Sequence, residues 1–383
     1  MMKINKLIVP ALSAIVLGSM GMAIANSTVK AETGFVYTMT NENDSNAIAV
    51  FARQQDGSLK LAGEPVSTGG KGIAKGDLED QSSLIMSGDM IFAANPGSDT
   101  ISVFRKMGGG KLGLIGKPTP SKGMTPVSLA FHDGLLFVAN QGYRGGEPNI
   151  TGFRVSMNGM LTPIEGSTKT FAKGAGPAQI SFSPTGATIA VTHGYQAAET
   201  SMVSLFKVGK EGKLTAAPGS PQTTGEFSGD VGFSWHPNGN HLFVSNFRGS
   251  GIVTFNVDSN SMELSRGAKT GDGESAACWT TISNDGKFLY VANYASNSVS
   301  TFGVGMKGAL SPIGVTKLSG HSSPDIKDLT LSPDGRFLYA IATTDRHIHA
   351  FKIGENGVPT ELGDMKGHLV VPGNGALKGL LAD

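Results

Sequence analysis

One histidine stands where other copies of a recurring segment carry asparagine. The apolar run 189–191 leads through Thr192 to His193, whereas the matching segments end at Asn140, Asn246 and Asn293. Histidine commonly moves protons near neutral pH, so His193 is a candidate general base. A polar residue that caps a turn in place of asparagine explains the same substitution. The sequence leaves both interpretations open.

A carboxylate next to a lysine is the second candidate for proton chemistry. Lys327 and Asp328 come shortly before the turn 332–335. A histidine and a carboxylate on one concave surface could polarise a water for attack on a lactone or similar ester. The sequence does not give the separation of His193 and Asp328, and an ion pair in the wall of a channel is the alternative for Lys327 and Asp328.

These residues belong to a segment that recurs seven times. Each copy combines a turn such as 332–335 (Ser-Pro-Asp-Gly) with apolar runs before and after it, which predicts strand, tight turn and strand. An aromatic residue ends the third strand of each copy, at spacings of 47 to 53 residues: Phe51, Phe104, Phe153, Phe206, Phe255, Phe302 and Phe351. We therefore predict an all-β fold, a seven-bladed β-propeller of four-stranded blades.

The first copy lacks a strand ahead of residues 34–40. The segment 376–381 reads like the inner strand of the other copies. We expect the C-terminal strand to join the N-terminal blade and close the ring.

The loops between strands predict one functional face. They vary in length on one side of each unit, while the Pro-Asp-Gly-type turns opposite stay short, and binding residues favour variable loops. Tyr143 and Arg144 lie in the loop 141–149. Charged residues between units would add a mixed, somewhat acidic rim, or are simply solvated charges: Asp77, Glu79, Asp80, Asp230, Asp272, Glu274, His321 and Asp325.

The N-terminus resembles an export signal. Lys3 and Lys6 precede the apolar run 7–17, and residues 23–25 (Ala-Ile-Ala) form a small-residue cleavage site. We expect a signal peptide at 1–25, a disordered lead-in at 26–34 and the propeller domain at 35–383, with an uncleaved membrane anchor as the alternative. The mature protein would be exported, periplasmic or extracellular, without a membrane span.

Composition excludes several classes of partner and cofactor. With 31 basic and 30 acidic side chains the formal charge is +1, so no nucleic acid is expected. Cys278 is the sole cysteine, which rules out an internal disulfide. His347 and His349 share a strand face without a third ligand nearby, and the glycines mark turns, so we expect no metal, no cofactor and a monomer.

The chain resembles the lactonase-like seven-bladed propellers, a family that includes 6-phosphogluconolactonases and carboxymuconate-lactonizing enzymes. The resemblance rests on strands such as 288–293 (Phe-Leu-Tyr-Val-Ala-Asn), on the Ser-Pro-Asp-Gly turns and on the segments 176–184 and 276–279, and it points to an exported bacterial branch. It implies a site at the central channel and the opening of a lactone.

The acid and base residues of that family are mostly replaced here. Alignment on the turns puts Ala178 and Gln179 where the family has Arg and His, and Trp279 and Thr281 where it has Glu and His, while the pair 327–328 (Lys-Asp) resembles a later Arg-Asp pair. His193 and Asp328 remain the candidate catalytic residues. The candidate ligand-binding residues are Lys327, Gln179, Trp279, Ser128, Tyr143 and Arg144.

Two functions are compatible with this pattern. One is an exported hydrolase that opens an unphosphorylated lactone or similar cyclic ester at the channel; an acidic rim disfavours a phosphorylated substrate. The other is a non-catalytic propeller that binds a small, sugar-like ligand or a protein partner on its looped face, which would explain the replaced residues.

Overall fold

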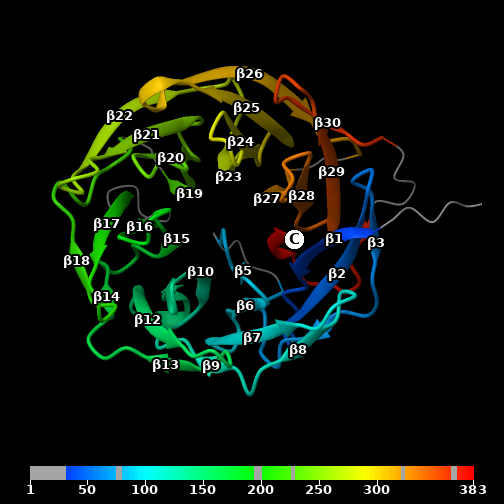
Figure 1. Cartoon of the computed structure of the whole chain (residues 1–383), viewed down its shortest axis with the longest axis horizontal. Coiled ribbons are helices and arrows are strands. Elements are labelled where there is room, and N and C mark those ends of the chain that lie inside the picture. Colours follow the sequence, from blue (N-terminus) through cyan, green and yellow to red (C-terminus); the bar gives the residue numbers. More distant parts are fainter. Residues whose placement is uncertain (1–31, 75–79, 194–200, 226–228, 321–323, 364–368) are drawn as a thin grey trace, which may run out of the picture.

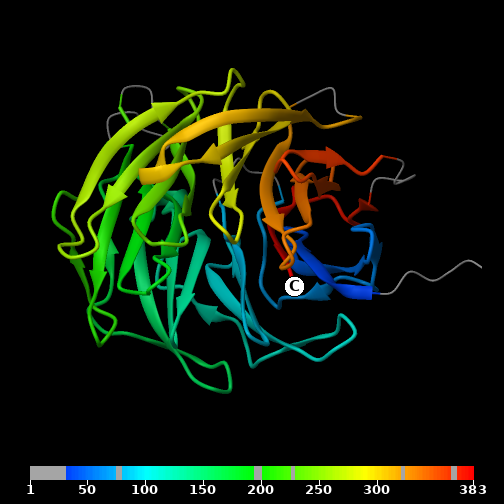
Figure 2. The same cartoon turned by 45° about the horizontal axis from the view of Figure 1, so that its top comes forward.

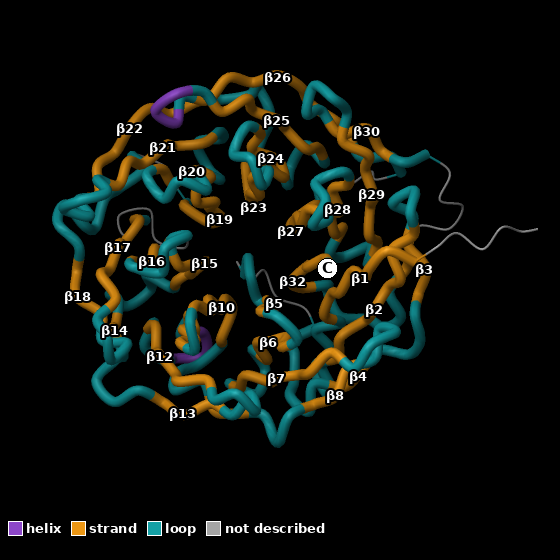
Figure 3. Tube along the Cα trace, in the orientation of Figure 1, coloured by secondary structure: helices purple, strands orange, loops and turns teal. Residues whose placement is uncertain are grey.

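Seven blades surround a central axis (Figure 1), as the repeat predicted. The computed structural model describes residues 32–74, 80–193, 201–225, 229–320, 324–363 and 369–383. Strands make up nearly all of the regular structure in these residues (Figure 3). The prediction of an all-β, seven-bladed propeller is confirmed.

Each blade is an antiparallel sheet of four main strands, and we number the blades in chain order. From the axis outward, blade 1 consists of β32 (Lys378–Ala382), β1 (Glu32–Met39), β2 (Ala47–Gln54) and β3 (Leu59–Leu61). Blade 2 consists of β5 (Leu84–Ser87), β6 (Met90–Asn95), β7 (Thr100–Lys106) and β8 (Leu112–Leu114). Blade 3 consists of β10 (Pro126–His132), β11 (Leu135–Asn140), β12 (Asn149–Val155) and β13 (Leu161–Pro163).

Blades 4 to 7 repeat the arrangement. They are formed by β15 (Pro177–Phe182), β16 (Thr188–His193), β17 (Met202–Val208) and β18 (Leu214–Ala216); β19 (Asp230–Trp235), β20 (His241–Asn246), β21 (Ile252–Val257) and β22 (Leu264–Thr270); β23 (Ala277–Ile282), β24 (Phe288–Asn293), β25 (Ser298–Val304) and β26 (Leu310–Lys317); and β27 (Ile326–Leu331), β28 (Phe337–Ala342), β29 (His347–Ile353) and β30 (Pro359–Glu361).

Short elements complete the blades. In four blades a two-residue strand also pairs with the third strand: β4 (Val66–Ser67), β9 (Thr119–Pro120), β14 (Lys169–Thr170) and β31 (Leu369–Val370). Two 3-10 helices lie in loops, η1 (Tyr143–Gly145) and η3 (Met306–Gly308). Because these elements have only two or three residues each, the longer strands position any site.

The core lies between neighbouring blades. Phe51, Phe104, Phe153, Phe255 and Phe302 are fully buried on their third strands. Around them, apolar residues of adjacent blades form separate clusters; one joins strands of blades 1 and 7, another joins blades 4 and 5. Each blade therefore buries its two faces against its neighbours, which is why a single unit could not be stable alone.

The ring is closed by the C-terminal strand, as predicted. β32 pairs antiparallel with β1, and Figures 1 and 2 both place the C-terminus beside the blue strands of blade 1. The side chain of Asp383 accepts hydrogen bonds from the Phe35 amide (2.6 Å) and the Tyr37 hydroxyl (3.0 Å) and pairs with Lys106 (2.6 Å). The last residue thus ties blades 1 and 2 together.

The predicted export signal, residues 1–25, lies outside the described residues. β1 already begins at Glu32, three residues inside the segment expected to be a disordered lead-in. Among the described residues, the helices are too short and too polar for any of them to cross a membrane.

Candidate functional site

Irregular register marks the inner strands where the candidate residues lie. The pairing of β10, β15, β19, β23 and β27 with the second strand of the blade skips one or two residues, and β32 skips Gly379 against β1. Such β-bulges twist a strand and redirect its side chains, and they are frequent beside active sites. The skipped residues include Ala178, Gly232, Trp279 and Asp328.

Side chains near the bulges connect β10 to β15 and β15 to β19. The Ser128 hydroxyl accepts the Ile180 amide (3.1 Å). The Gln179 amide accepts the Phe233 N–H (2.5 Å) and donates to the Phe233 carbonyl (3.1 Å). These hydrogen bonds link neighbouring blades beside the channel and satisfy backbone groups next to the bulges.

Gln81 makes a further link, across the channel. It precedes blade 2, yet its amide donates to the Thr280 carbonyl in blade 6 (2.5 Å) and accepts the Thr280 N–H (3.3 Å). Blade 5 has Gly232 at its bulge, and a Cβ there would lie 2.3 Å from Gln81 Oε1. Gln81 thus occupies the space that a side chain at position 232 of blade 5 would fill. It also reaches across the channel, from the segment before blade 2 to blade 6.

A central cavity of about 340 Å³ lies beside this crossing. It is lined by residues from six blades: Gln81, Ser82, Leu84, Gln179, Ser181, Phe182, Pro184, Phe233, Ser234, Trp235, Thr280, Thr281, Ile282, Asp328, Leu329, Thr330 and Leu380. Several of these end the inner strands at the Pro-Asp-Gly-type turns. The cavity therefore lies toward the turn face, whereas the loops had predicted that function gathers on the opposite face.

Asp328 is the one titratable side chain among the described residues that line the central cavity. Burial raises the pKa of its carboxyl well above the usual value, and the charge of Asp80 raises it further. Hydrogen bonds from the amides of Leu329 and Leu380 and the charge of Lys378 act in the opposite direction. Desolvation dominates, so the protonated carboxyl is favoured.

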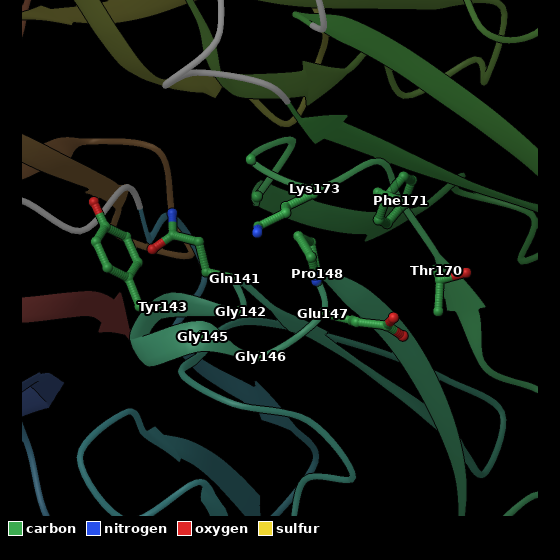
Figure 4. Close-up of a pocket in the computed structure, with 12 residues that line it drawn as sticks. Gln141, Gly142, Tyr143, Gly145, Gly146, Glu147, Pro148, Thr170, Phe171 and Lys173 are labelled. Carbon is green, nitrogen blue, oxygen red and sulfur yellow. The ribbon is translucent and has the colours of Figure 1, made fainter.

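A second, larger cavity opens among the loops of blades 3 and 4. Its volume is about 560 Å³, and its lining includes Gln141, Tyr143, Glu147, Phe171 and Lys173. Figure 4 shows Lys173 extending toward Gln141 from one side, with Tyr143 on the other side of Gln141. We call it the loop cavity; it offers aromatic rings and polar groups of both charges.

His193 is the last residue of β16, and its ring contacts Phe171, which lines the loop cavity. Its Nε2 is 2.9 Å from the Ser204 hydroxyl, and its ring lies against Phe171 with centroids 4.5 Å apart. Burial lowers its pKa from 6.5 to about 4, and Nδ1 has no hydrogen-bond partner among the described residues. Asn95 and Asn293 make the corresponding bonds, to Ser102 and Ser300. The geometry fits a histidine that replaces a structural asparagine.

The structure brings some predicted residues together and separates others. Asp328 and Gln179 line the central cavity, and Tyr143 lines the loop cavity, but His193 is in neither described lining. Trp279 is 1% exposed within an apolar cluster with Ala178. The binding roles of these residues remain predictions.

Three further candidates have partners within the protein. The Ser128 hydroxyl donates to the Gln81 carbonyl (2.6 Å), and the Lys327 ammonium lies 5.5 Å from the ring centroid of Tyr294. Arg144 pairs with Asp99 (2.5 Å). Their roles toward a ligand likewise remain predictions.

Two residues of the expected acidic rim are buried. Asp80 pairs with Lys378 (3.4 Å), and Asp325 accepts the amides of Thr344 (2.7 Å) and Asp345 (2.8 Å). The expectation that they are solvated was wrong, because each satisfies buried groups. The sequence marked Asp80 only as a loop charge and did not mark Gln81, because neither residue type by itself signals a contact with a distant part of the chain.

The described residues hold no group of three or more His, Cys, Asp or Glu arranged to bind a metal. The Nδ1 of His349 instead lies 2.7 Å from a Glu361 oxygen. Neither cavity has, among its described lining residues, a ligand set of the kind that Zn²⁺ or Ca²⁺ requires.

Solved structures share the fold. A protein from Lactobacillus plantarum is 17% identical, with a TM-score of 0.75 over 92% of this chain and 100% of that chain. The periplasmic gluconolactonase of Pseudomonas aeruginosa is 19% identical (TM-score 0.73; 90% and 98% covered). A Bacteroides uniformis protein, provisionally assigned as a 6-phosphogluconolactonase, is 18% identical (0.66; 86% and 95%).

Sequence comparison identifies the family. No curated protein matches the chain significantly. A family model described as a lactonase with a seven-bladed β-propeller matches residues 149–281 and 263–374, more than half of the chain. Together with the ring of seven blades, this match shows that the chain belongs to the lactonase family of seven-bladed β-propellers.

Proposed function

We propose that the protein hydrolyses an unphosphorylated lactone or a similar cyclic ester in the central cavity, with Asp328 as the catalytic acid. The observation that carries the proposal is a buried carboxyl with a raised pKa in the wall of a cavity. Perturbed titratable groups in clefts are candidate catalytic residues. The volume, about 340 Å³, falls in the usual range for small-molecule sites.

Lactone hydrolysis requires one proton transfer that Asp328 could perform. Water adds to the ring carbonyl carbon, the bond from that carbon to the ring oxygen breaks, and the ring oxygen leaves as a hydroxyl group. A protonated Asp328 would give the ring oxygen its proton as the bond breaks and regain one from the attacking water. The product is a hydroxy acid, whose ionisation releases one proton to solution.

The lining favours a neutral, polyhydroxylated substrate. Among its described residues are the hydroxyl groups of Ser181, Ser234, Thr281 and Thr330, and there is no lysine or arginine. A phosphorylated substrate would need such cations. The name of the Pseudomonas neighbour, a periplasmic gluconolactonase, agrees with this substrate class and with export.

The test is proton release from a panel of unphosphorylated sugar and aliphatic lactones, recorded by pH-stat on the purified protein. We expect turnover of at least one lactone and a loss of about a hundredfold or more in Asp328→Asn. Asp285→Asn, at an exposed turn, is the matched control and should keep full activity. Unchanged activity in Asp328→Asn would remove this residue from the mechanism.

A second function is favoured by the loop cavity. It is the larger of the two, and it presents Tyr143 and Phe171 as stacking surfaces beside polar groups. A non-catalytic propeller would bind a sugar-like ligand or a protein partner there. Lactones that bind without being hydrolysed, with affinity lost in Tyr143→Ala and kept in Asp328→Asn, would support this function over hydrolysis.

We also propose that the protein is exported as a monomer. The basic and apolar N-terminus supports export. Cell fractionation should find a chain that begins near residue 26 in the periplasm or the medium, and its mass by light scattering should be that of one chain. A full-length cytoplasmic product would refute the export signal, and a dimeric mass would refute the monomer.

A further inference from the structure

The inner strands of blades 4 to 7 carry hydroxyl groups at a position where the other blades carry aliphatic side chains. In each blade, one inner-strand residue is in register, through the second strand, with the phenylalanine of the third strand; we call the residue before it the matched position. It holds a hydroxyl group in blades 4 to 7: Ser181, Ser234, Thr281 and Thr330. In blades 1 to 3 it holds Leu381, Ile85 and Ala130. Packing of a blade therefore does not require a hydroxyl group there.

The four hydroxyl-bearing residues line the central cavity, whereas the three aliphatic ones are not in its described lining. Their strands, β15, β19, β23 and β27, follow one another around the axis (Figure 1). From blades 1 and 2, the strands β32 and β5 contribute Leu380 and Leu84 to the same cavity. The wall along blades 4 to 7 thus offers hydroxyl groups that the lining residues of β32 and β5 lack.

Two of the four hydroxyl groups have partners within the protein. The Ser181 hydroxyl donates to the Phe182 carbonyl (3.2 Å), and the hydroxyl oxygens of Ser234 and Thr280 lie 2.8 Å apart. Thr281 and Thr330 are different, because among the described residues neither hydroxyl has a hydrogen-bond partner. Both residues are half-buried in the cavity wall, so water or a bound ligand must complete their hydrogen bonds.

Free hydroxyl groups in a cavity wall favour a ligand that carries hydroxyl groups of its own. A hydroxyl both donates and accepts, so it can pair with a sugar hydroxyl in either direction. A ligand without hydroxyl groups would displace the water on Thr281 and Thr330 and leave both side chains unpaired. A site of this kind discriminates strongly against the analogue that lacks the polar group.

We propose that Thr281 and Thr330 determine substrate specificity, by pairing with hydroxyl groups of the lactone so that a sugar lactone is preferred to an aliphatic lactone of the same ring size. The inference rests on the lactone hydrolysis proposed above and adds the residues that recognise the substrate. Asp328 and Thr330 line the cavity from the same strand, β27. The acid and a selecting hydroxyl can therefore act on one small ring.

The first test compares kcat/KM for glucono-δ-lactone with kcat/KM for δ-valerolactone, which has the same ring without hydroxyl groups. Thr281→Val and Thr330→Val should each lower the ratio of the two values by about tenfold or more, because each loses one hydrogen bond to the sugar. Both variants should fold, since the matched position is aliphatic in blades 1 to 3, and thermal unfolding checks this. Thr360→Val, on the exposed strand β30, is the matched control and should keep the ratio.

The second test measures recognition without turnover, by calorimetric titration with the lactams of the same two rings. The wild type should bind the hydroxylated lactam at least about tenfold more tightly than δ-valerolactam, and each threonine variant should lose most of this preference. A wild type that binds both lactams equally, or folded variants that keep the full preference, would overturn the proposal.

The two tests separate substrate recognition from hydrolysis. No lactone turnover, together with lactam binding that depends on Thr281 and Thr330, would refute hydrolysis and leave recognition. Turnover that depends on Asp328, with an unchanged ratio in both threonine variants, would refute recognition and leave hydrolysis. Neither turnover nor lactam binding would refute both.

Discussion

His193 shows how a residue with chemical potential can serve a structural role. It takes the position of an asparagine, keeps the hydrogen bond to a hydroxyl of the next strand and fills the remaining space by packing on Phe171. Burial favours the neutral ring. The sequence could show that His193 replaces asparagine, but its surroundings depend on Phe171, a loop residue 22 positions earlier.

Acid stability tests this interpretation of His193. The pKa is about 4 in the folded protein against 6.5 for an ordinary histidine, so the unfolded chain gains a proton first as the pH falls. Stability should therefore be lost between about pH 6.5 and 4, by on the order of 3 kcal/mol. His193→Asn should remove most of this loss, as measured by urea unfolding at several pH values.

The variant His193→Asn also tests whether His193 takes part in catalysis. His193→Asn should keep lactone hydrolysis within a few-fold of wild type, because asparagine is the residue of the other blades and His193 lies in neither described cavity lining. A loss comparable to that of Asp328→Asn would instead make His193 part of the machinery and contradict the structural interpretation.

At the scale of the element, the bulged inner strands explain why the site was harder to predict than the fold. Turns and apolar alternation are local, so seven units could be identified from residues a few positions apart. The bulges have no comparable signal: they fall at residues as different as Ala178, Gly232 and Asp328. The contact of Gln81 with Thr280 joins residues 199 positions apart, and no local pattern encodes it.

The fit between Gly232 and Gln81 predicts a specific coupling. Gly232→Ala would place a methyl group 2.3 Å from Gln81 Oε1 and 2.8 Å from Trp279 Cε3, so we expect a loss of about 1 to 3 kcal/mol in unfolding free energy. Gly271→Ala, with open space around its Cβ, is the matched control and should change little.

The double variant makes this coupling measurable. Gln81→Ala removes two hydrogen bonds to Thr280 but also removes the nearest of the three atoms that the added methyl group would meet. Gly232→Ala should therefore cost less in the Gln81→Ala background than in the wild type, a non-additive result in urea unfolding. Additive losses would mean that the glutamine does not occupy the missing side-chain position.

At the scale of the whole molecule, the C-terminal strand β32 makes two separate contributions to the structure. β32 closes the ring by pairing with β1, and it carries Lys378, which forms the buried ion pair with Asp80. The sequence predicted the closure, because the first unit lacked a strand and the last residues supplied one. It did not predict the buried lysine, because a lysine on an inner strand is read as solvated until the packing around Gly379 is known.

Loss of the closing strand should unfold the ring. Deleting residues 374–383 removes β32 and leaves the edge of β1 unpaired, so we expect an aggregated or unfolded product by circular dichroism and size-exclusion chromatography. Asp383→Asn, which keeps the strand but weakens the ion pair with Lys106, should fold and lose about 1 to 2 kcal/mol. Glu211→Gln, at an exposed ion pair, is the control and should be neutral.

The most direct test of lactone hydrolysis in the central cavity is a crystal structure with a lactam analogue of a lactone that the protein turns over, since a lactam resists hydrolysis. We predict density in the central cavity, with the ring within hydrogen-bonding distance of the Asp328 carboxyl. Density confined to the loop cavity beside Tyr143 would contradict this prediction.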